Sequence, residues 1–188
     1  MPQGYRVADF GAGSGEYSLH LARHVGRGGS VYAFDALPAL LEKIRREAGK
    51  HDAEVFTLHA DLNEHIPLRD NLLHTAVVSN LLHALKERTR FVSELKRVIA
   101  PKGRALVVDW KGSFQNMGPT AESVVPLEEA LGLFENAGFK TGKVLPGAFI
   151  ITPSLRIVEM RADNVQPRFL AAVHCALHAV RYTLYYVG

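Results

Sequence analysis

Hydrophobic residues along the chain gather in short continuous runs that alternate with helix-like patterns. The runs are rich in β-branched residues and predict strands at residues 5–10, 30–35, 53–58, 74–80 and 104–110. Between them, apolar residues at three- and four-residue spacing predict helices at 15–26, 37–49 and 86–99. Strands that alternate with helices, and that are apolar along their whole length, are typical of a parallel sheet covered on both faces. The pattern therefore predicts an α/β fold.

The rhythm changes after residue 110. A loop over 111–125 precedes a predicted helix at 127–137, and two further strands at 139–146 and 155–162 are expected to close the sheet, with one of them antiparallel. The helix predicted at 86–99, before the fifth strand, is expected to bury one apolar face. It is expected to end at two residues that stop helices, Pro101 and Gly103.

The length and composition fit a single globular domain. A chain of 188 residues can bury one sizeable core but is too short for two ordinary domains. Hydrophobic residues make up 47% and charged residues 22%, which excludes a disordered or fibrous chain. We expect one domain over residues 1–163 and a C-terminal helical extension over residues 164–188.

Charge and cysteine content exclude several classes of function. The net charge is +3, and Lys and Arg are interleaved with Asp and Glu, so there is no dense basic stripe and nucleic acid is disfavoured as a partner. The single cysteine, Cys175, excludes an internal disulfide and a Cys-rich zinc site. The sequence has no secretory leader pattern and no uncharged apolar run of about 20 residues that would span a membrane. We expect a cytoplasmic location.

Three glycines at alternate positions follow the first predicted strand, in the stretch VADFGAGSGEYS (7–18). A glycine turn between a strand and a helix lets backbone N–H groups approach a ligand closely. The dinucleotide fingerprint is G-x-G-x-x-G, whereas here Glu16 follows a G-x-G-x-G pattern and would repel a pyrophosphate. A sulfonium cofactor such as S-adenosylmethionine carries no phosphate. Asp35 ends the second strand, where a carboxylate can bind the ribose hydroxyls of either cofactor.

With these motifs the sequence resembles the class I S-adenosylmethionine-dependent methyltransferases, and specifically their UbiE-like methyltransferase-domain group. The resemblance covers about residues 5–161. It rests on four motifs in order: VADFGAGSGEYS, VYAFDALPALL (31–41), HADLNEHIPLRDNLLHTAVVSNLLHAL (59–85) and LKRVIAPKGRALVVDW (95–110). It implies a Rossmann-like fold with a seven-stranded, mostly parallel sheet in the order 3-2-1-4-5-7-6, strand 7 antiparallel, and helices on both faces.

The resemblance also implies that S-adenosylmethionine is the cofactor and S-adenosylhomocysteine its product. It further implies which residues bind the cofactor. They are the glycine loop, an acid on the ribose, an acid beside the adenine amino group and a polar pair at the methionine end: Asp9, Gly11, Ala12, Gly13, Gly15, Tyr17, Asp35, Ala36, Asp61, Leu62, Ser79 and Asn80. For Asp9 and Asp61 a capping role is the alternative. For Tyr17 the alternative is ordinary core packing.

Candidate catalytic residues follow the fourth and fifth predicted strands. His83 is a candidate general base, with a loop histidine of no catalytic role as the alternative. Asp109 and Trp110 are expected to face the acceptor, Trp110 as an apolar wall with ordinary packing as the alternative, and Asp109 is the second catalytic candidate. Two histidine pairs have i, i+4 spacing but lack the glutamate of an H-E-x-x-H motif, so we predict no metal site at either: His20/His24 and His174/His178.

The first functional hypothesis is a methyltransferase that acts on a small-molecule acceptor by in-line transfer, a reaction that needs mainly alignment of the reactants. Members of the group usually carry helices before the first strand, whereas this chain starts close to it. The cover of the cofactor is therefore expected from the C-terminal helix or from a second subunit, in a homodimer or with a partner. The segment 115–119 is a candidate lid, with a plain surface connection as the alternative. The alternatives are a cofactor-binding subunit that is inactive alone and, less favoured, an RNA methyltransferase.

Overall fold

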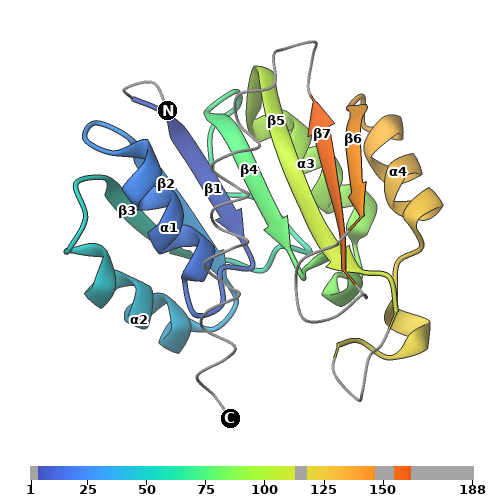
Figure 1. Ribbon diagram of the computed structural model, residues 1–188, viewed down its shortest axis with the longest axis horizontal. Helices are drawn as coiled ribbons and strands as arrows, with labels where there is room; N and C mark the ends of the chain where they lie inside the picture. Colours follow the sequence, from blue (N-terminus) through green and yellow to red (C-terminus); the bar gives the residue numbers. More distant parts are fainter. Residues whose placement is uncertain (1–3, 113–117, 147–154, 162–188) are drawn as a thin grey trace.

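The computed structural model describes residues 4–112, 118–146 and 155–161. Within these ranges the strands form one seven-stranded sheet in the order β3-β2-β1-β4-β5-β7-β6 (Figure 1). The strands are β1 (Arg6–Phe10), β2 (Ser30–Asp35), β3 (Glu54–His59), β4 (Leu73–Ser79), β5 (Ile99–Trp110), β6 (Lys140–Pro146) and β7 (Leu155–Arg161). Strands β1 to β5 pair in parallel, and β7 runs antiparallel to both β5 and β6. The predicted fold class and strand order are confirmed.

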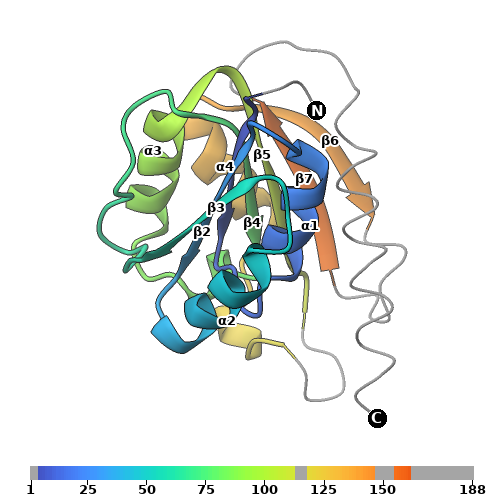
Figure 2. The ribbon, with the colours of Figure 1, turned by 90° about the vertical axis from the view of Figure 1, so that its left-hand side faces the viewer.

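Helices cover both faces of the sheet, as Figure 2 shows for α1 on one side and α3 and α4 on the other. The described helices are α1 (Glu16–Val25), α2 (Pro38–Ala48), α3 (Arg88–Val98) and α4 (Leu127–Asn136), with short 3₁₀ turns η1 (Leu82–Ala84) and η2 (Ala121–Ser123). The start of α2 carries Pro38, whose fixed φ suits the first helical turn. Among the described helices, none is long and apolar enough to cross a membrane.

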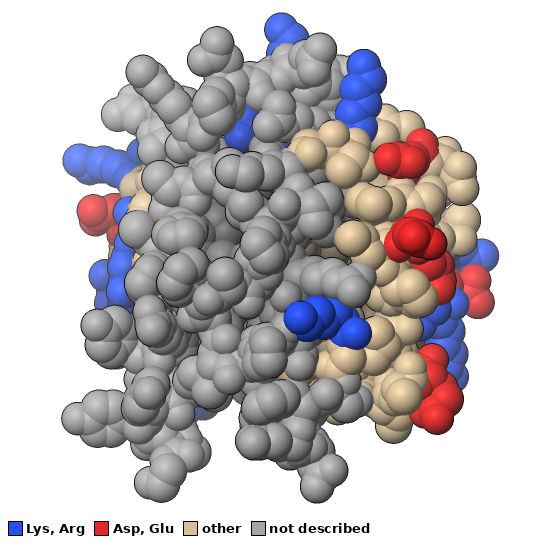
Figure 3. Space-filling view, turned by 45° about the vertical axis from the view of Figure 1, so that its right-hand side comes forward, with Lys and Arg blue, Asp and Glu red and all other residues tan. Residues whose placement is uncertain are grey.

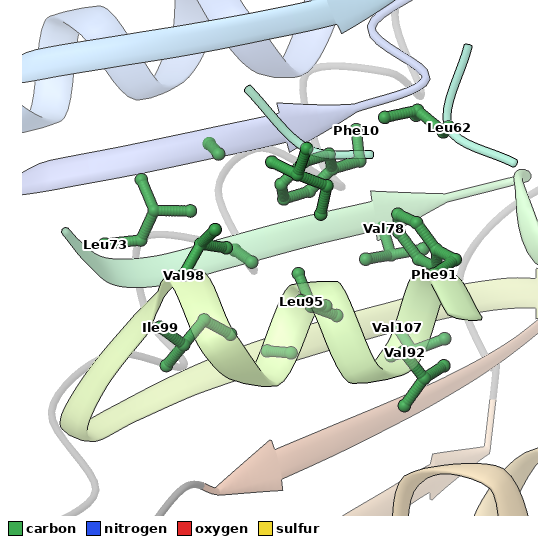
Figure 4. Packing of buried hydrophobic residues seen from close by; sticks show 14 of the residues in the cluster. Phe10, Leu62, Leu73, Val78, Phe91, Val92, Leu95, Val98, Ile99 and Val107 are labelled. Carbon is green, nitrogen blue, oxygen red and sulfur yellow. The ribbon is translucent and has the colours of Figure 1, made fainter. Parts of the chain in front are cut away.

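The main core lies between the sheet and α3. The sequence places four apolar side chains on one face of this helix, and all four are buried: Phe91, Val92, Leu95 and Val98. Figure 4 shows them close to Phe10 of β1, Val78 of β4 and Val107 of β5. Each such side chain stabilises the fold by about 1.5–3 kcal/mol when it is fully buried. This packing fixes the positions of β4 and β5, whose carboxyl ends carry several candidate site residues.

The junction between α3 and β5 is tighter than predicted. The helix ends at Val98, and β5 begins at Ile99 rather than at residue 104, so the predicted stop signals lie inside the first part of the strand. The pairing register jumps there, because Leu73 faces Ile99 while Thr75 faces Arg104. Gly103 is required at this bulge, since a Cβ atom on it would lie 2.6 Å from Cγ2 of Ile99.

The connection between β3 and β4, residues 60–72, has no helix and is held against α3 by an ion-pair network. Arg97 donates hydrogen bonds to the carbonyl oxygens of Ile66 and Leu68, both at 2.8 Å, and to Glu94. Glu94 accepts the N–H of Ile66 at 3.1 Å. The bond from Arg97 lowers the pKa of Glu94 to about 2. This network fixes the connection that carries Asp61 and Leu62.

Candidate active site

Candidate site residues lie at the carboxyl edge of the sheet, where β1, β2, β4 and β5 end. In Figure 1 the arrowheads of β1, β4 and β5 point to the same edge of the molecule. The strand order reverses between β1 and β4, because β2 and β3 continue on one side and β5 on the other. Ligands of open α/β sheets bind in the crevice at such a switch point. The predicted site is therefore assembled at the expected edge.

The glycine loop folds over the end of β2. The N–H groups of Gly11 and Ala12 both donate to the carbonyl oxygen of Phe34, at 3.0 and 2.8 Å. Gly11, Gly13 and Gly15 have backbone φ values of 77°, 53° and 88°, which residues other than glycine rarely adopt.

The three glycines have different surroundings. A Cβ atom on Gly15 would lie 2.5 Å from Cγ1 of Ile44, so this glycine lets the start of α1 pack against α2. A Cβ atom on Gly13 would have only the carbonyl oxygen of Gly11 within 4 Å, at 4.0 Å. Gly13 therefore faces open space, where a ligand can approach its backbone.

Asp35 joins the ends of β1 and β2. Its Oδ2 accepts the N–H of Gly13 at 2.8 Å, and its Oδ1 accepts the N–H of Leu37 at 2.9 Å. Each carboxylate oxygen can accept more than one hydrogen bond, so both remain able to accept a hydroxyl. The carboxylate is thus held by backbone groups in the position predicted for the ribose.

Asp9 is fully buried below the glycine loop. The hydroxyl of Ser18 donates to its Oδ2 at 2.6 Å, while Oδ1 has no hydrogen-bond partner among the described residues. Burial is the main reason why the pKa of Asp9 is raised to about 6. Ser18 lies in the first part of α1, so this bond ties Asp9 to the start of the helix, whose N-cap residue is Gly15 and has no side-chain cap. A buried carboxyl oxygen without a partner favours a cation or a hydrogen-bond donor beside it.

Tyr17, Ser79 and Asn80 lie where β1 and β4 end. Burial raises the pKa of Tyr17 to about 12, against a smaller lowering effect of the nearby Ser79. The Oγ atom of Ser79 is buried and lacks a partner at hydrogen-bonding geometry. Tyr17 also packs against the apolar cluster of α1 and β1. Its side chain therefore takes part in core packing and also lies close to the candidate site. Asn80 is exposed, has a φ of 52° and donates its N–H to Val108 at 2.8 Å.

Asp61 and Leu62 follow β3 in the connection held by Arg97. Oδ1 of Asp61 accepts both the backbone N–H and the side-chain amide of Asn63 at 2.9 Å, and these bonds lower its pKa. This geometry matches the capping alternative for Asp61. The side chain of Leu62 is buried in the main core, so its backbone is the part that can face a ligand.

His83 and Asp109 form a hydrogen-bonded pair between η1 and the end of β5. Nδ1 of His83 lies 2.6 Å from Oδ1 of Asp109, and the His83 N–H donates to Oδ2 at 3.2 Å. The N–H of Trp110 donates to Oδ1 at 2.8 Å. The two side chains are 18% and 11% exposed. The structure thus brings the two predicted catalytic candidates into direct contact.

An apolar pocket adjoins this pair. Its lining comes from η1, from β5, from α4 and from the residues just before α4: Leu82, Val107, Asp109, Trp110, Val125, Leu127 and Ala130. Asp109 is the charged residue in this lining. The ring of Trp110 packs on Gly118, where a Cβ atom would lie 2.7 Å from its Cε3. The pocket has a free volume of about 20 Å³, which is room for about one water molecule, so it is a narrow apolar opening beside Asp109.

Sequence reasoning did not identify Ser18 or Ile44. Ser18 is a fully buried polar residue on an otherwise apolar helix face, and that placement is a signal of a buried hydrogen bond to Asp9. Ile44 sits on α2, and nothing near Gly15 in the sequence indicates its contact. The α4 contribution to the pocket was also not foreseen.

The described residues contain no cluster of three or more His, Cys, Asp or Glu that could hold a metal ion. Nδ1 of His24 is hydrogen-bonded to the carbonyl oxygen of His20 at 2.9 Å. The second predicted pair, His174/His178, and the C-terminal extension lie outside the described residues. Most of the candidate lid, residues 115–119, also lies outside them.

A protein-family model described as a methyltransferase domain matches residues 7–103. The match is slightly more than half of the 188-residue chain. It includes the glycine loop, Asp35 and His83, and it ends before Asp109.

Curated relatives include enzymes named for quinones. The chain is 30% identical over 178 residues to a 2-phytyl-1,4-naphtoquinone methyltransferase of Trichormus variabilis, covering 88% of this chain and 72% of that protein. It is 29% identical over 112 residues to the ubiquinone/menaquinone biosynthesis C-methyltransferase UbiE of Haemophilus ducreyi, covering 57% of this chain and 42% of the relative. The chain thus spans less than half of the second relative.

Solved structures share the architecture. The crystal structure of a SAM dependent methyltransferase from Aquifex aeolicus matches with a TM-score of 0.72 and 30% sequence identity, covering 86% of this chain and 84% of that one.

Proposed function

Because the chain belongs to the methyltransferase-domain family of class I S-adenosylmethionine-dependent enzymes, we propose that it transfers a methyl group from S-adenosylmethionine to a small-molecule acceptor. The observation that carries the proposal is the link between Asp35 and the N–H of Gly13, at 2.8 Å. It holds a carboxylate and an open glycine loop side by side at the switch point of the sheet. Such a pair fits a ribose and the atoms attached to it.

The residues present fit this cofactor better than a dinucleotide. The unpartnered Oδ1 of the buried Asp9 suits the cationic methionine end, and Ser79 and Asn80 lie at the neighbouring strand end. Ala36 and Asp61 would lie along the adenine. Glu16 opens α1 where a pyrophosphate would bind, so a cofactor without phosphate avoids repulsion.

The cofactor supplies a methyl group on a positively charged sulfur, which is already a good leaving group. The chain therefore has to hold the acceptor in line and exclude water. The acceptor is proposed to lie at the carboxyl ends of β4 and β5, near the His83–Asp109 pair and next to the narrow apolar pocket of η1, β5 and α4, which Asp109 lines. Its apolar walls, together with the quinone names of the relatives, favour a flat apolar acceptor.

The comparisons lend no support to a cofactor-binding subunit that is inactive alone. An RNA acceptor is also not favoured, because acidic and basic side chains lie side by side on the described part of the face in Figure 3. A domain over residues 1–163 is supported by β7, which completes the sheet at Arg161. A homodimer or partner contact through residues 164–188 stays a prediction, since that segment lies outside the described residues.

Calorimetric titration with S-adenosylmethionine, and with NAD as the competing cofactor, tests the proposal. The wild type is expected to bind S-adenosylmethionine alone, and Asp35→Ala is expected to weaken binding about 10- to 100-fold, because hydrogen bonds to a charged group contribute about 1.5–3 kcal/mol. Asp52→Ala is the matched control, since Asp52 is an exposed carboxylate before the amino end of β3. Binding of NAD, or equal binding by all three proteins, would contradict the proposal.

A further inference from the structure

Asn63, in the connection between β3 and β4, hydrogen-bonds to two separate parts of the candidate site. Its backbone N–H and its side-chain Nδ2 both donate to Oδ1 of Asp61, at 2.9 Å. Its side-chain oxygen accepts the backbone N–H groups of Lys86 and Glu87, at 2.8 and 3.1 Å. One half-buried residue thus joins the segment that follows β3 to the segment where α3 begins.

The chemistry of these partners fixes the orientation of the Asn63 amide. Backbone N–H groups can only donate hydrogen bonds, and an ionised carboxylate can only accept them. An amide turned by 180° would place its NH₂ group against the N–H groups of Lys86 and Glu87, and its oxygen against the carboxylate of Asp61. An asparagine therefore satisfies both sides at once, whereas an aspartate would satisfy only the α3 side and an alanine neither.

The bonds from Asn63 leave the second oxygen of Asp61 able to bind a ligand. Both bonds end on Oδ1, whereas Oδ2 belongs to an exposed side chain and can accept a hydrogen bond from outside. The same bonds lower the pKa of Asp61, so the carboxylate is ionised at neutral pH. A capping contact and an adenine contact are therefore compatible, because they use different oxygens.

On its other side, Asn63 holds the junction between η1 and α3. This junction follows His83 and contains Glu87, the N-cap residue of α3, whose side chain makes no capping bond. Backbone N–H groups at a helix start need an acceptor that the helix itself does not provide, and Asn63 supplies it from a distant part of the chain. A displacement of Asn63 therefore acts on the carboxylate of Asp61 and on this junction together.

From these contacts we infer that Asn63 is the positioning residue for recognition of the adenine. It holds the carboxylate of Asp61 as an acceptor for the adenine amino group and ties that carboxylate to the junction of η1 and α3. The inference rests on the proposed function, in which Asp61 lies along the adenine. An ionised carboxylate accepts a hydrogen bond from the amino group of adenine but repels the carbonyl oxygen that replaces this group in hypoxanthine.

Calorimetry with two probes that differ only in the base tests the positioning role: S-adenosylhomocysteine and its deaminated analogue S-inosylhomocysteine. The wild type is expected to bind the adenine compound about 10- to 100-fold more tightly. In Asn63→Asp a second carboxylate replaces the donor and favours a protonated carboxyl group, which can donate to hypoxanthine. The preference is therefore expected to fall at least about fivefold.

The ratio of the two affinities separates positioning from a structural role. A variant that merely loosens the fold would weaken both probes equally and leave their ratio unchanged. Asn71→Asp is the matched control, because it makes the same change at an exposed residue of the same connection, and it should keep the wild-type preference. Asp61→Ala removes the acceptor itself and should abolish most of the preference.

Hydrogen exchange of the Lys86 and Glu87 amides tests the link to α3 in the protein without cofactor. Asn63→Asp keeps an oxygen acceptor and should leave the exchange rates of these amides within about threefold of the wild type. Asn63→Ala removes the acceptor and should raise both rates at least about tenfold. Amides inside α3, such as that of Leu95, should exchange as before in both variants.

An unchanged base preference in Asn63→Asp or in Asp61→Ala would overturn the inference, as would wild-type exchange of the two amides in Asn63→Ala. Failure of the proposed function gives a different result. Binding of neither probe by the wild type would count against S-adenosylmethionine as the cofactor, and the adenine role of Asn63 would fall with it.

Discussion

The two halves of the candidate site are built in different ways. The half formed by β1, β2 and the glycine loop depends on backbone groups: N–H donors, left-handed glycines and one carboxylate that joins two loops. The half formed by β4, β5 and α4 depends on side chains, with apolar walls and the His83–Asp109 pair. The first half is therefore fixed by the course of its loops, whereas the second can change through side-chain substitutions alone.

Filling the pocket is expected to give the largest effect that distinguishes the two halves, a loss of methyl transfer without a loss of cofactor affinity. Ala130→Phe adds a ring to α4 at the pocket wall and is expected to reduce methyl transfer to a flat apolar acceptor at least about 100-fold, because the acceptor can no longer reach its aligned position. Cofactor affinity in calorimetry should stay within about twofold. Ala48→Phe, at the end of α2, adds the same bulk away from the pocket and is the control. A parallel loss of cofactor affinity in Ala130→Phe would show that the halves are not independent.

A glycine substitution should damage the other half instead. Gly15→Val combines a φ of 88° with a Cβ atom 2.5 Å from Ile44 Cγ1. We expect it to lower the free energy of unfolding by about 2–4 kcal/mol, measured by urea denaturation. Gly13→Ala meets open space and should lower it by only about 1–2 kcal/mol, the strain of its φ. In a double-mutant cycle, the cost of Ile44→Ala should be smaller in the Gly15→Val background than in the wild type, and unchanged in the Gly13→Ala background. Equal losses in the two glycine variants would contradict the packing role of Gly15.

The buried Asp9 should make the cofactor half sensitive to pH. Its pKa is raised from 3.8 to about 6, so the folded state keeps a proton that the unfolded chain loses. Its contribution to stability is therefore full below about pH 4, falls as the pH rises to about 6, and is constant above, with a loss on the order of 2–3 kcal/mol.

Denaturation at several pH values checks this, with Asp9→Asn as the reference because its amide does not titrate. The stability difference between the two proteins should change between pH 4 and 6 in the stated direction. Binding of the cationic cofactor below pH 6 should also release a proton from Asp9. Calorimetry would detect this release because the measured heat of binding then differs between buffers with different heats of ionisation. A stability difference that does not vary with pH would show that Asp9 is not protonated in the fold.

The smallest effect is expected from the network below the β3–β4 connection. Arg97→Ala leaves the carbonyl oxygens of Ile66 and Leu68 without their donor and should lower the free energy of unfolding by about 1–3 kcal/mol. Arg45→Ala removes an exposed ion pair with Glu42 and should change it by less than about 1 kcal/mol. Urea denaturation measures both. Equal effects would mean that the network does not hold the connection.

The difference between the halves also explains how much was predictable from the sequence. The sheet order, the glycine loop and Asp35 come from local patterns and from motif spacing, and the structure places them as expected. The partner of Asp109 lies 26 residues away in the sequence, and the pocket walls come from three separate stretches of the chain, so only the packing of β4, β5 and α4 brings them together. The early start of β5 was missed because Pro101 and Gly103 indicate a stop, whereas the strand pairing continues around a bulge.

The most direct test of this account is one titration series with S-adenosylmethionine across the wild type, Asp35→Ala and His83→Asn. The wild type and His83→Asn are expected to bind with the same affinity, and Asp35→Ala about 10- to 100-fold more weakly. Equal weakening by both substitutions, or by neither, would contradict the assignment of the cofactor to the glycine-loop half and of the acceptor chemistry to the His83–Asp109 half.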